Sequence, residues 1–109
     1  MTQKNVAEAL NVFYELKAAL ENAYWETNDI NQKDRFFSMK SMLQDELDEL
    51  HKLSLQDHSY PYEAINPSVP RLKVRLQSLL ENLDNIVYRP ESFQSLAELI
   101  PKTTDLFDA

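Results

Sequence analysis

The residues best suited to chemistry lie in one acidic run at positions 44–50, which has the sequence QDELDEL. The run contains Asp45, Glu46, Asp48 and Glu49, and His51 follows Asp48 at the three-residue spacing that carboxylate and imidazole ligands share on some metal-binding helices. A metal centre inside a helical bundle also needs ligands that project inward from several helices. At 100° per residue, Asp45, Asp48 and Glu49 point away from the leucine face of their own helix, and no other predicted helix supplies ligands. The sequence therefore predicts no metal site and no cofactor.

The same outward carboxylates permit a second interpretation. Asp45, Asp48 and Glu49 stand at fixed spacing on a rigid helix, as phosphates do along a duplex, so they could occupy a basic, DNA-binding protein. A net charge of −7 suits such an acidic inhibitor or nucleic-acid mimic. Charged outer faces are, however, the rule on small helical bundles, and a solvated face without a partner is the simpler interpretation.

Catalytic chemistry finds little support in the sequence. The chain has no cysteine and no glycine, which excludes thiolate chemistry, zinc–thiolate sites and the glycine-rich loops that cradle phosphates. His51 and His58 are the only histidines, and His58 stands between Asp57 and Ser59. Neighbours in the chain cannot by themselves form a Ser-His-Asp relay, because its three side chains must converge from separate positions. We therefore expect no catalytic residue and no enzyme activity.

A basic group, Arg71, Lys73 and Arg75, stands near the start of a predicted helix and is a candidate anion site. The helical wheel places Lys73 on the opposite flank of the apolar stripe from Arg71 and Arg75, so the three do not converge. Cations that extend along the edge of the core are the favoured interpretation.

Two apolar groups outside the predicted helices are candidates for contact with a protein partner. The first is Tyr60 and Tyr62 in the loop 56–67, because tyrosine supplies a rigid, amphipathic contact surface. The second is Leu106 and Phe107 in the C-terminal segment. Both groups have a structural alternative: the tyrosines would close the open end of the bundle, and the tail residues would pack on it.

The tail sequence Asp105-Leu106-Phe107 is similar to the last three residues of the bacterial sliding-clamp-binding pentapeptide, Gln-Leu-Asp/Ser-Leu-Phe. Thr103 and Thr104 occupy the first two positions of that pentapeptide. The resemblance covers five positions, and it implies only that Leu106 and Phe107, on a mobile acidic tail, could dock in a groove of another protein.

Composition favours a single helical domain. The 109 residues are 43% hydrophobic and 27% charged, which is ordinary for a chain with one folded core. The absence of glycine argues against an architecture rich in β-hairpins. The net charge of −7 disfavours direct binding of nucleic acid or anionic membranes, and no apolar run approaches the ~20 residues of a membrane span. The first ten residues do not resemble a signal peptide, and we expect a cytoplasmic location.

Apolar residues spaced three and four apart predict an all-α fold, an up-down-up bundle of three long helices with a short fourth helix folded back on it. The long helices are expected at about residues 3–26, 32–54 and 68–88, and the short one at about 91–100, where Pro101 should end it. In this prediction residues 1–101 form one domain and residues 102–109 a flexible acidic tail.

The same pattern predicts the helix caps and the core. Thr2 is the expected cap of the first helix, and Asp29 or Asn31 that of the second. The expected core contains mid-helix residues of the apolar stripes: Phe13, Leu20, Leu43, Leu47, Leu76 and Leu79.

The first predicted helix carries a second apolar stripe, Ala7, Tyr14, Ala18 and Trp25, about 100° around the wheel from the core stripe. We expect the fourth helix to cover part of it. Ten helical residues span only ~15 Å of a stripe ~27 Å long, so apolar surface near Ala7 and Tyr14 should stay exposed. Such patches mark association sites, and the sequence predicts a two-fold homodimer through the first helix or an equivalent surface for a protein partner. These features together predict a small acidic, non-enzymatic interaction or regulatory module.

Overall fold

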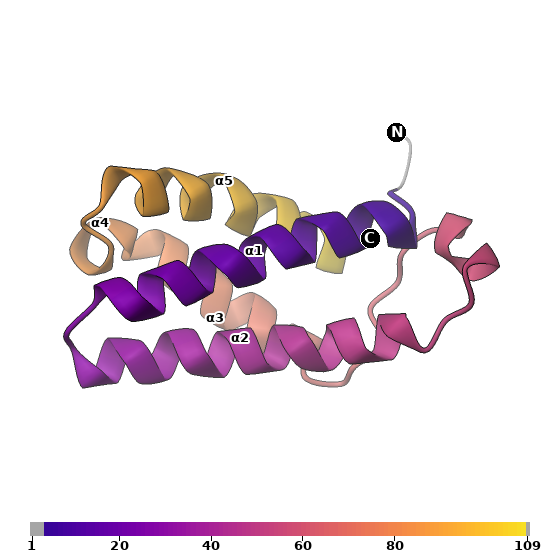
Figure 1. Ribbon diagram of the computed structural model, residues 1–109, viewed down its shortest axis with the longest axis horizontal. Helices are drawn as coiled ribbons and strands as arrows, with labels where there is room; N and C mark the ends of the chain where they lie inside the picture. Colours follow the sequence, from indigo (N-terminus) through magenta and orange to yellow (C-terminus); the bar gives the residue numbers. More distant parts are fainter. Residues whose placement is uncertain (1–3, 109) are drawn as a thin grey trace.

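The computed structural model describes residues 4–108 and is built from helices (Figure 1). They are α1 (Val6–Glu26), α2 (Ile30–His51), α3 (Val69–Glu81), α4 (Leu83–Ile86) and α5 (Pro90–Phe107), with a short 3-10 helix, η1 (Gln56–Ser59), after α2. Within the described residues no β-strand forms, although Asn5 and Pro61 make one isolated antiparallel bridge. The predicted all-α class is confirmed.

Local side-chain bonds explain where α1 and α2 begin. The Asn5 side chain accepts a hydrogen bond from the Glu8 backbone N–H at 2.9 Å, and Glu8 accepts one from the Asn5 backbone N–H at 3.2 Å, a reciprocal capping box. The expected cap Thr2 lies outside the described residues. Asp29, one of the two predicted caps of α2, accepts from the backbone N–H of Asn31 at 2.8 Å.

The third predicted helix is shorter than its apolar pattern suggests. Instead of one helix over residues 68–88, α3 ends at Glu81 and α4 follows after Asn82. The Asn82 backbone has left the helical region, with φ −110° and ψ 14°, and its side-chain amide donates to the Ser78 carbonyl at 2.9 Å. Such local bonds from asparagine compete with the backbone pattern of a helix, so an uninterrupted apolar stripe does not guarantee a continuous helix.

The fourth predicted helix is longer than expected, because Pro101 lies inside α5 and does not end it. Proline cannot donate a hydrogen bond to the carbonyl four residues earlier, but the turn that follows is held in other ways. Thr103 Oγ1 donates to the Leu99 carbonyl at 2.9 Å, Leu106 is buried, and the Phe107 ring lies 5.5 Å from that of Phe13. Tertiary packing therefore carries the helix through residues that the sequence assigned to the tail.

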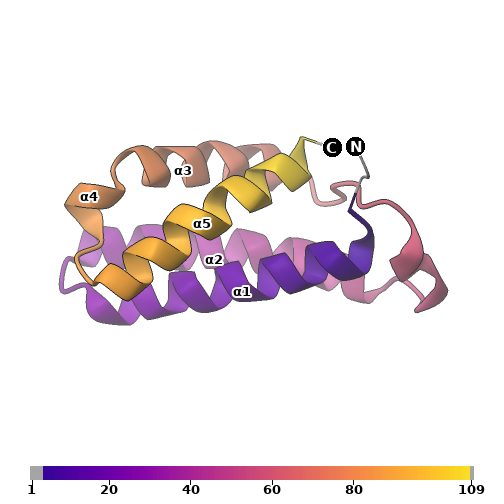
Figure 2. The same ribbon diagram turned by 90° about the horizontal axis from the view of Figure 1, so that it is seen from above.

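The longer helices α1, α2, α3 and α5 alternate in direction along a body of 42 × 26 × 20 Å (Figure 1). α1 packs against α2 and α5, while α3 packs against α5 and α2. Figure 2 shows α5 crossing obliquely between α1 and α3, toward the end of the molecule where α1 begins.

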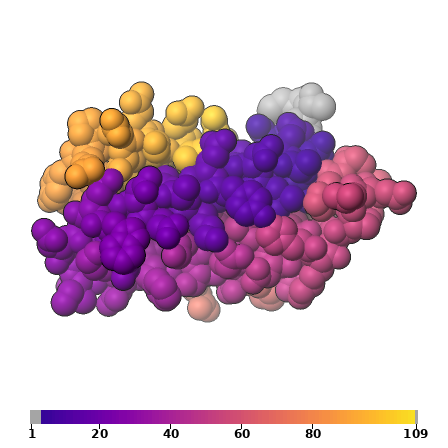
Figure 3. All heavy atoms as spheres, in the orientation of Figure 1, coloured from indigo at the N-terminus to yellow at the C-terminus, as the bar shows by residue number. Residues whose placement is uncertain are grey.

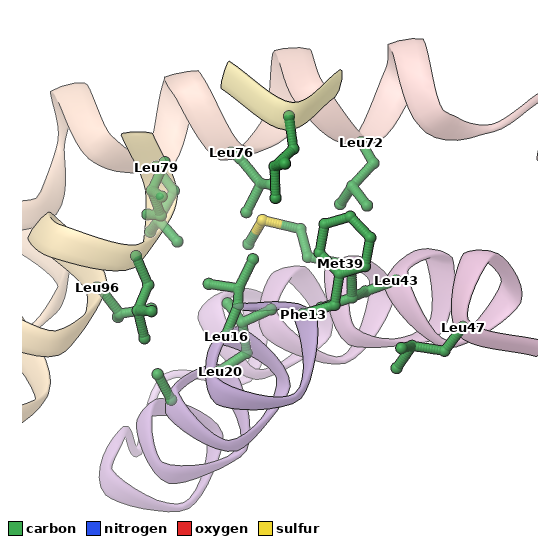
Figure 4. Close-up of a cluster of buried hydrophobic side chains, with 14 of the residues drawn as sticks. Phe13, Leu16, Leu20, Met39, Leu43, Leu47, Leu72, Leu76, Leu79 and Leu96 are labelled. Carbon is green, nitrogen blue, oxygen red and sulfur yellow. The ribbon is translucent and has the colours of Figure 1, made fainter. Parts of the chain in front are cut away.

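The core lies between these four helices, and side chains from all of them point toward one another in Figure 4. The six predicted core residues are all buried, which confirms that part of the sequence analysis. The labelled members are Phe13, Leu16 and Leu20 of α1, Met39, Leu43 and Leu47 of α2, Leu72, Leu76 and Leu79 of α3, and Leu96 of α5.

Candidate protein-binding surface

The second stripe of α1 faces outward along its whole length. Ala7 and Ala18 are exposed, Tyr14 is 45% exposed and Trp25 is 72% exposed. The expectation that the fourth helix folds over this stripe is wrong, because α5 lies on a different flank of α1. The apolar exposure is therefore larger than the sequence predicted.

The flank that α5 covers is marked by small and polar side chains. Ala19 is buried there, and the Ser92 hydroxyl donates to the Glu26 carboxylate at 2.6 Å. Ala19 and Glu26 also border a shallow hollow together with Ser92 and Ser95 of α5. A small residue lets two helix backbones approach closely, which the bulky rings of Tyr14 and Trp25 would prevent.

Exposed aromatic rings gather where α1 meets α2. The Trp25 and Tyr24 rings meet edge to face at 5.1 Å, and the Tyr24 and Phe37 rings lie 6.5 Å apart. Phe37 of α2 is 56% exposed. We call the face formed by Tyr14, Ala18, Trp25 and Phe37 the aromatic surface. Figures 1 and 3 show α1 and α2 side by side on the face turned toward the viewer, where no other segment of the described chain crosses in front of them.

Lysine side chains lie against the aromatic surface. Lys33 Nζ is 4.4 Å from the centre of the Tyr24 ring and 5.5 Å from that of Trp25, and it donates to the Tyr24 carbonyl at 2.7 Å. Lys40 Nζ lies 5.8 Å from the centre of the Phe37 ring. These cation–π contacts and the carbonyl bond fix the α1–α2 seam without covering the Trp25 or Phe37 rings.

Tyr14 is tied to the end of α2. Its hydroxyl and His51 Nε2 are hydrogen-bonded, and the two rings are stacked with centroids 5.8 Å apart. His51 therefore has a structural partner, and Tyr14 keeps part of its ring in solvent at the second end of the aromatic surface.

The predicted acidic face is present on α2. Asp45 and Asp48 are exposed and Glu49 is half-buried, with Asp48 accepting from the Gln44 amide at 2.9 Å and Glu49 from Lys52 at 3.2 Å. Asp45 lines the same shallow hollow as Phe37, so the acidic face adjoins the aromatic surface. Over residues 4–108, no group of three or more histidine, aspartate and glutamate side chains is arranged to hold a metal ion.

Glu46, the fourth carboxylate of the run, is fully buried, which the sequence analysis missed. It accepts hydrogen bonds from the Tyr62 hydroxyl and from the backbone N–H groups of Ile65, at 3.1 Å, and Asn66, at 2.8 Å. We call this arrangement the Glu46 clamp. The signal was available: Glu46 follows Leu43 by three residues and precedes Leu50 by four, so it shares their flank of the helix.

Tyr62 is the residue of the loop 56–67 that closes the bundle. Burial raises the pKa of its hydroxyl well above the usual value, and the hydrogen bond to the Glu46 carboxylate and the charge of that group raise it further. Its ring meets Phe13 edge to face at 5.3 Å, and its backbone N–H donates to the Lys4 carbonyl at 2.9 Å. Tyr60, by contrast, is exposed. The structural alternative thus describes Tyr62, and of the two tyrosines only Tyr60 faces solvent.

The tail candidates pack on the bundle that carries them. Leu106 is buried, and Phe107 is half-buried against Phe13. Because α5 extends to Phe107, the five positions that were compared with the sliding-clamp-binding pentapeptide, residues 103–107, are helical.

The fold and surface together define a small helical bundle with an exposed aromatic surface. Comparison with models of known families, with curated proteins and with solved structures finds no match to this chain. Within the described part of the chain, each helix is too short or too polar to cross a membrane.

Proposed function

We propose that this chain is a small non-enzymatic interaction module, which binds another protein through the aromatic surface. The observation that carries the proposal is the exposure of Trp25 and Phe37, at 72% and 56%, from two neighbouring helices, with both rings packed near the Tyr24 ring between them. Tryptophan and other aromatic residues dominate the energetics of protein interfaces, because a rigid ring buries a large area at little cost in conformational entropy.

The bundle suits this role because the rings stand on long helices. We infer that the up-down-up order of α1, α2 and α3 holds α1 and α2 side by side, so that their exposed rings share one face. The cytoplasmic location expected from the sequence is part of the same proposal. Sites on helices are held more precisely than sites on loops, so a partner would meet a preformed surface.

The test is affinity capture from native cell extract with three forms of the chain: wild type, the double variant Trp25→Ala/Phe37→Ala, and the control Leu55→Ala. Leu55 is also exposed and apolar, but it follows the C-terminal end of α2, whereas Phe37 lies in the N-terminal half of that helix. We expect proteins that bind the wild type and the control and are lost from the double variant. Capture of the same proteins by all three forms would contradict the proposal.

A homodimer is the special case in which the partner is a second copy. Sedimentation equilibrium of the wild type and of Tyr14→Glu distinguishes it. A dimer that dissociates in the variant makes the aromatic surface a self-association site, whereas a monomer in both forms leaves the surface to a different protein.

The acidic face supports a second candidate function, binding to a basic, DNA-binding protein as a nucleic-acid mimic. Asp45 and Asp48 are exposed on one helix of a chain whose net charge is −7. Reversal of Asp45, Asp48 and Glu49 to lysine should abolish such binding and change the free energy of unfolding by only ~0.5 kcal/mol per residue. A basic partner that binds the triple variant with unchanged affinity would exclude the mimic.

A further inference from the structure

A hollow of about 250 Å³ lies between α2 and α3, away from the aromatic surface. One helical turn of each helix lines it, together with one residue of α4: Arg35 and Met39 of α2, Arg75, Ser78 and Leu79 of α3, and Ile86 of α4. Both arginines are exposed, whereas Met39 and Leu79 are buried and Ile86 is half-buried. The hollow therefore has an apolar floor and a cationic rim.

Two arginines from different helices line the same hollow. Arg75 reaches across from α3, and its Nη1 donates to the Ser38 hydroxyl of α2 at 2.7 Å. This bond orients the guanidinium and uses one of its five N–H donors. Arg35 supplies a second guanidinium from α2, and among residues 4–108 none with a carboxylate lines the hollow.

The presence of Arg35 in the same hollow changes the interpretation of the basic group on α3. Lys73 pairs with Asp108 on the other flank, as its position on the wheel indicated. Arg75 instead gains its companion from α2, which the sequence pattern of one helix could not show.

We propose that this hollow binds a small amphiphilic monocarboxylate, with its apolar chain on Met39, Leu79 and Ile86 and its carboxylate between the guanidinium groups of Arg35 and Arg75. Arginine matches a carboxylate with parallel N–H donors, and charge-assisted bonds of this kind are stronger than neutral ones. Few precisely placed polar groups over an apolar lining are the usual features of a small-molecule site.

Size and charge decide between this ligand and its competitors. The lining spans four residues on each helix, or ~6 Å, whereas the i to i+7 anchors of a docking helix span ~10 Å. A short chain therefore fits better than a partner helix. A phosphate dianion meets the same two guanidiniums, but the net charge of −7 repels a dianion more strongly than a monoanion.

The test is a titration of the full chain with sodium octanoate, followed by NMR signals of the Met39, Leu79 and Ile86 methyl groups. We expect saturable shifts confined to these groups. Octanol lacks the carboxylate that would contact the arginines, and acetate lacks the chain that would contact the apolar floor. Each should therefore bind at least about tenfold more weakly than octanoate. Octyl phosphate is the competing anion and should bind more weakly than octanoate.

Arginine variants distinguish binding in this hollow from nonspecific binding of a surfactant elsewhere on the protein. Arg35→Gln and Arg75→Gln should each weaken octanoate binding by about tenfold, the loss of one charge-assisted contact. Arg71→Gln is the matched control, since Arg71 is exposed on the same helix but does not line the hollow, and its affinity should equal that of the wild type. In the titration, the proposal is overturned if no saturable shift appears, if the shifts centre on Trp25 and Phe37, or if octyl phosphate binds more tightly than octanoate. Among the variants, it is overturned if Arg71→Gln loses as much affinity as Arg75→Gln.

Discussion

At the loop end of the bundle the Tyr62 ring is fully buried and its hydroxyl is bonded to a buried carboxylate, whereas near the α1–α2 turn the larger ring of Trp25 is 72% exposed. Both residues are aromatic, and they belong to segments at opposite ends of the same long body, the loop after η1 and the last turn of α1 (Figure 1). The polar group that accompanies each ring differs. Tyr62 donates to Glu46 inside the core, while Trp25 lies beside Lys33 at the surface.

Aromatic residues have two different roles in this chain. A buried tyrosine needs a partner for its hydroxyl, and the Glu46 clamp supplies one while it also binds the loop backbone at Ile65 and Asn66. No equivalent arrangement surrounds Trp25 within the described residues, and α5 packs on a different flank of α1. The loop end is therefore built for stability, and the aromatic surface has apolar area that folding does not use.

The largest expected effect comes from removal of the Glu46 clamp. Glu46→Ala leaves the Tyr62 hydroxyl and two backbone N–H groups without their acceptor and creates a cavity, so the free energy of unfolding should fall by about 3–5 kcal/mol. Urea unfolding followed by circular dichroism measures it. Asp45→Ala, one residue earlier and exposed, should change the same quantity by no more than ~0.5 kcal/mol. Equal losses in the two variants would show that the clamp does not stabilise the fold.

An intermediate effect is expected from alkaline pH through Tyr62. Its pKa is raised in the folded state above the ordinary value of 10.0, so above that pH the unfolded chain loses the proton while the folded chain retains it. The contribution of Tyr62 is therefore complete below about pH 10 and is lost as the pH rises further. Urea midpoints should fall more steeply above about pH 10 in the wild type than in Tyr62→Phe. Tyr60→Phe, at an exposed site of the same loop, should retain the wild-type slope; identical slopes in all three would contradict the assignment.

The part of the fold that the sequence predicted depends on helical periodicity. Leu43, Leu47 and Leu76 recur at core spacing, and they are buried because an apolar stripe leaves water only when it packs against other helices. Helix ends were less predictable. Asn82 breaks a continuous stripe with a local side-chain bond, and Pro101 is tolerated because packing of Leu106 holds the next turn. Both outcomes depend on tertiary contacts or local geometry that periodicity does not encode.

The candidate surface was predicted in part, for a related reason. The wheel identified Tyr14 and Trp25 as a separate stripe, but it could not determine which flank of α1 the last helix would cover. Phe37 lay off its own stripe, and only the packing of α2 beside α1 brought it near Tyr24. Glu46 could have been found from its position between Leu43 and Leu50, whereas its donors come from a loop whose path no spacing rule predicts.

The smallest effect on stability is expected at the aromatic surface, and it is the one on which the proposed function depends most. Trp25→Ala/Phe37→Ala removes two exposed rings that lie against Tyr24 and the ammonium groups of two lysines, so the free energy of unfolding should fall by less than about 1 kcal/mol. Because Trp25 is the only tryptophan, urea unfolding must be followed by circular dichroism rather than by tryptophan fluorescence. A loss as large as that of Glu46→Ala would mean that the rings support the fold, and their exposure would then no longer argue for a partner. If the free energy of unfolding falls only slightly and the captured protein is lost, then Trp25 and Phe37 contribute to binding of a partner and not to stability of the fold.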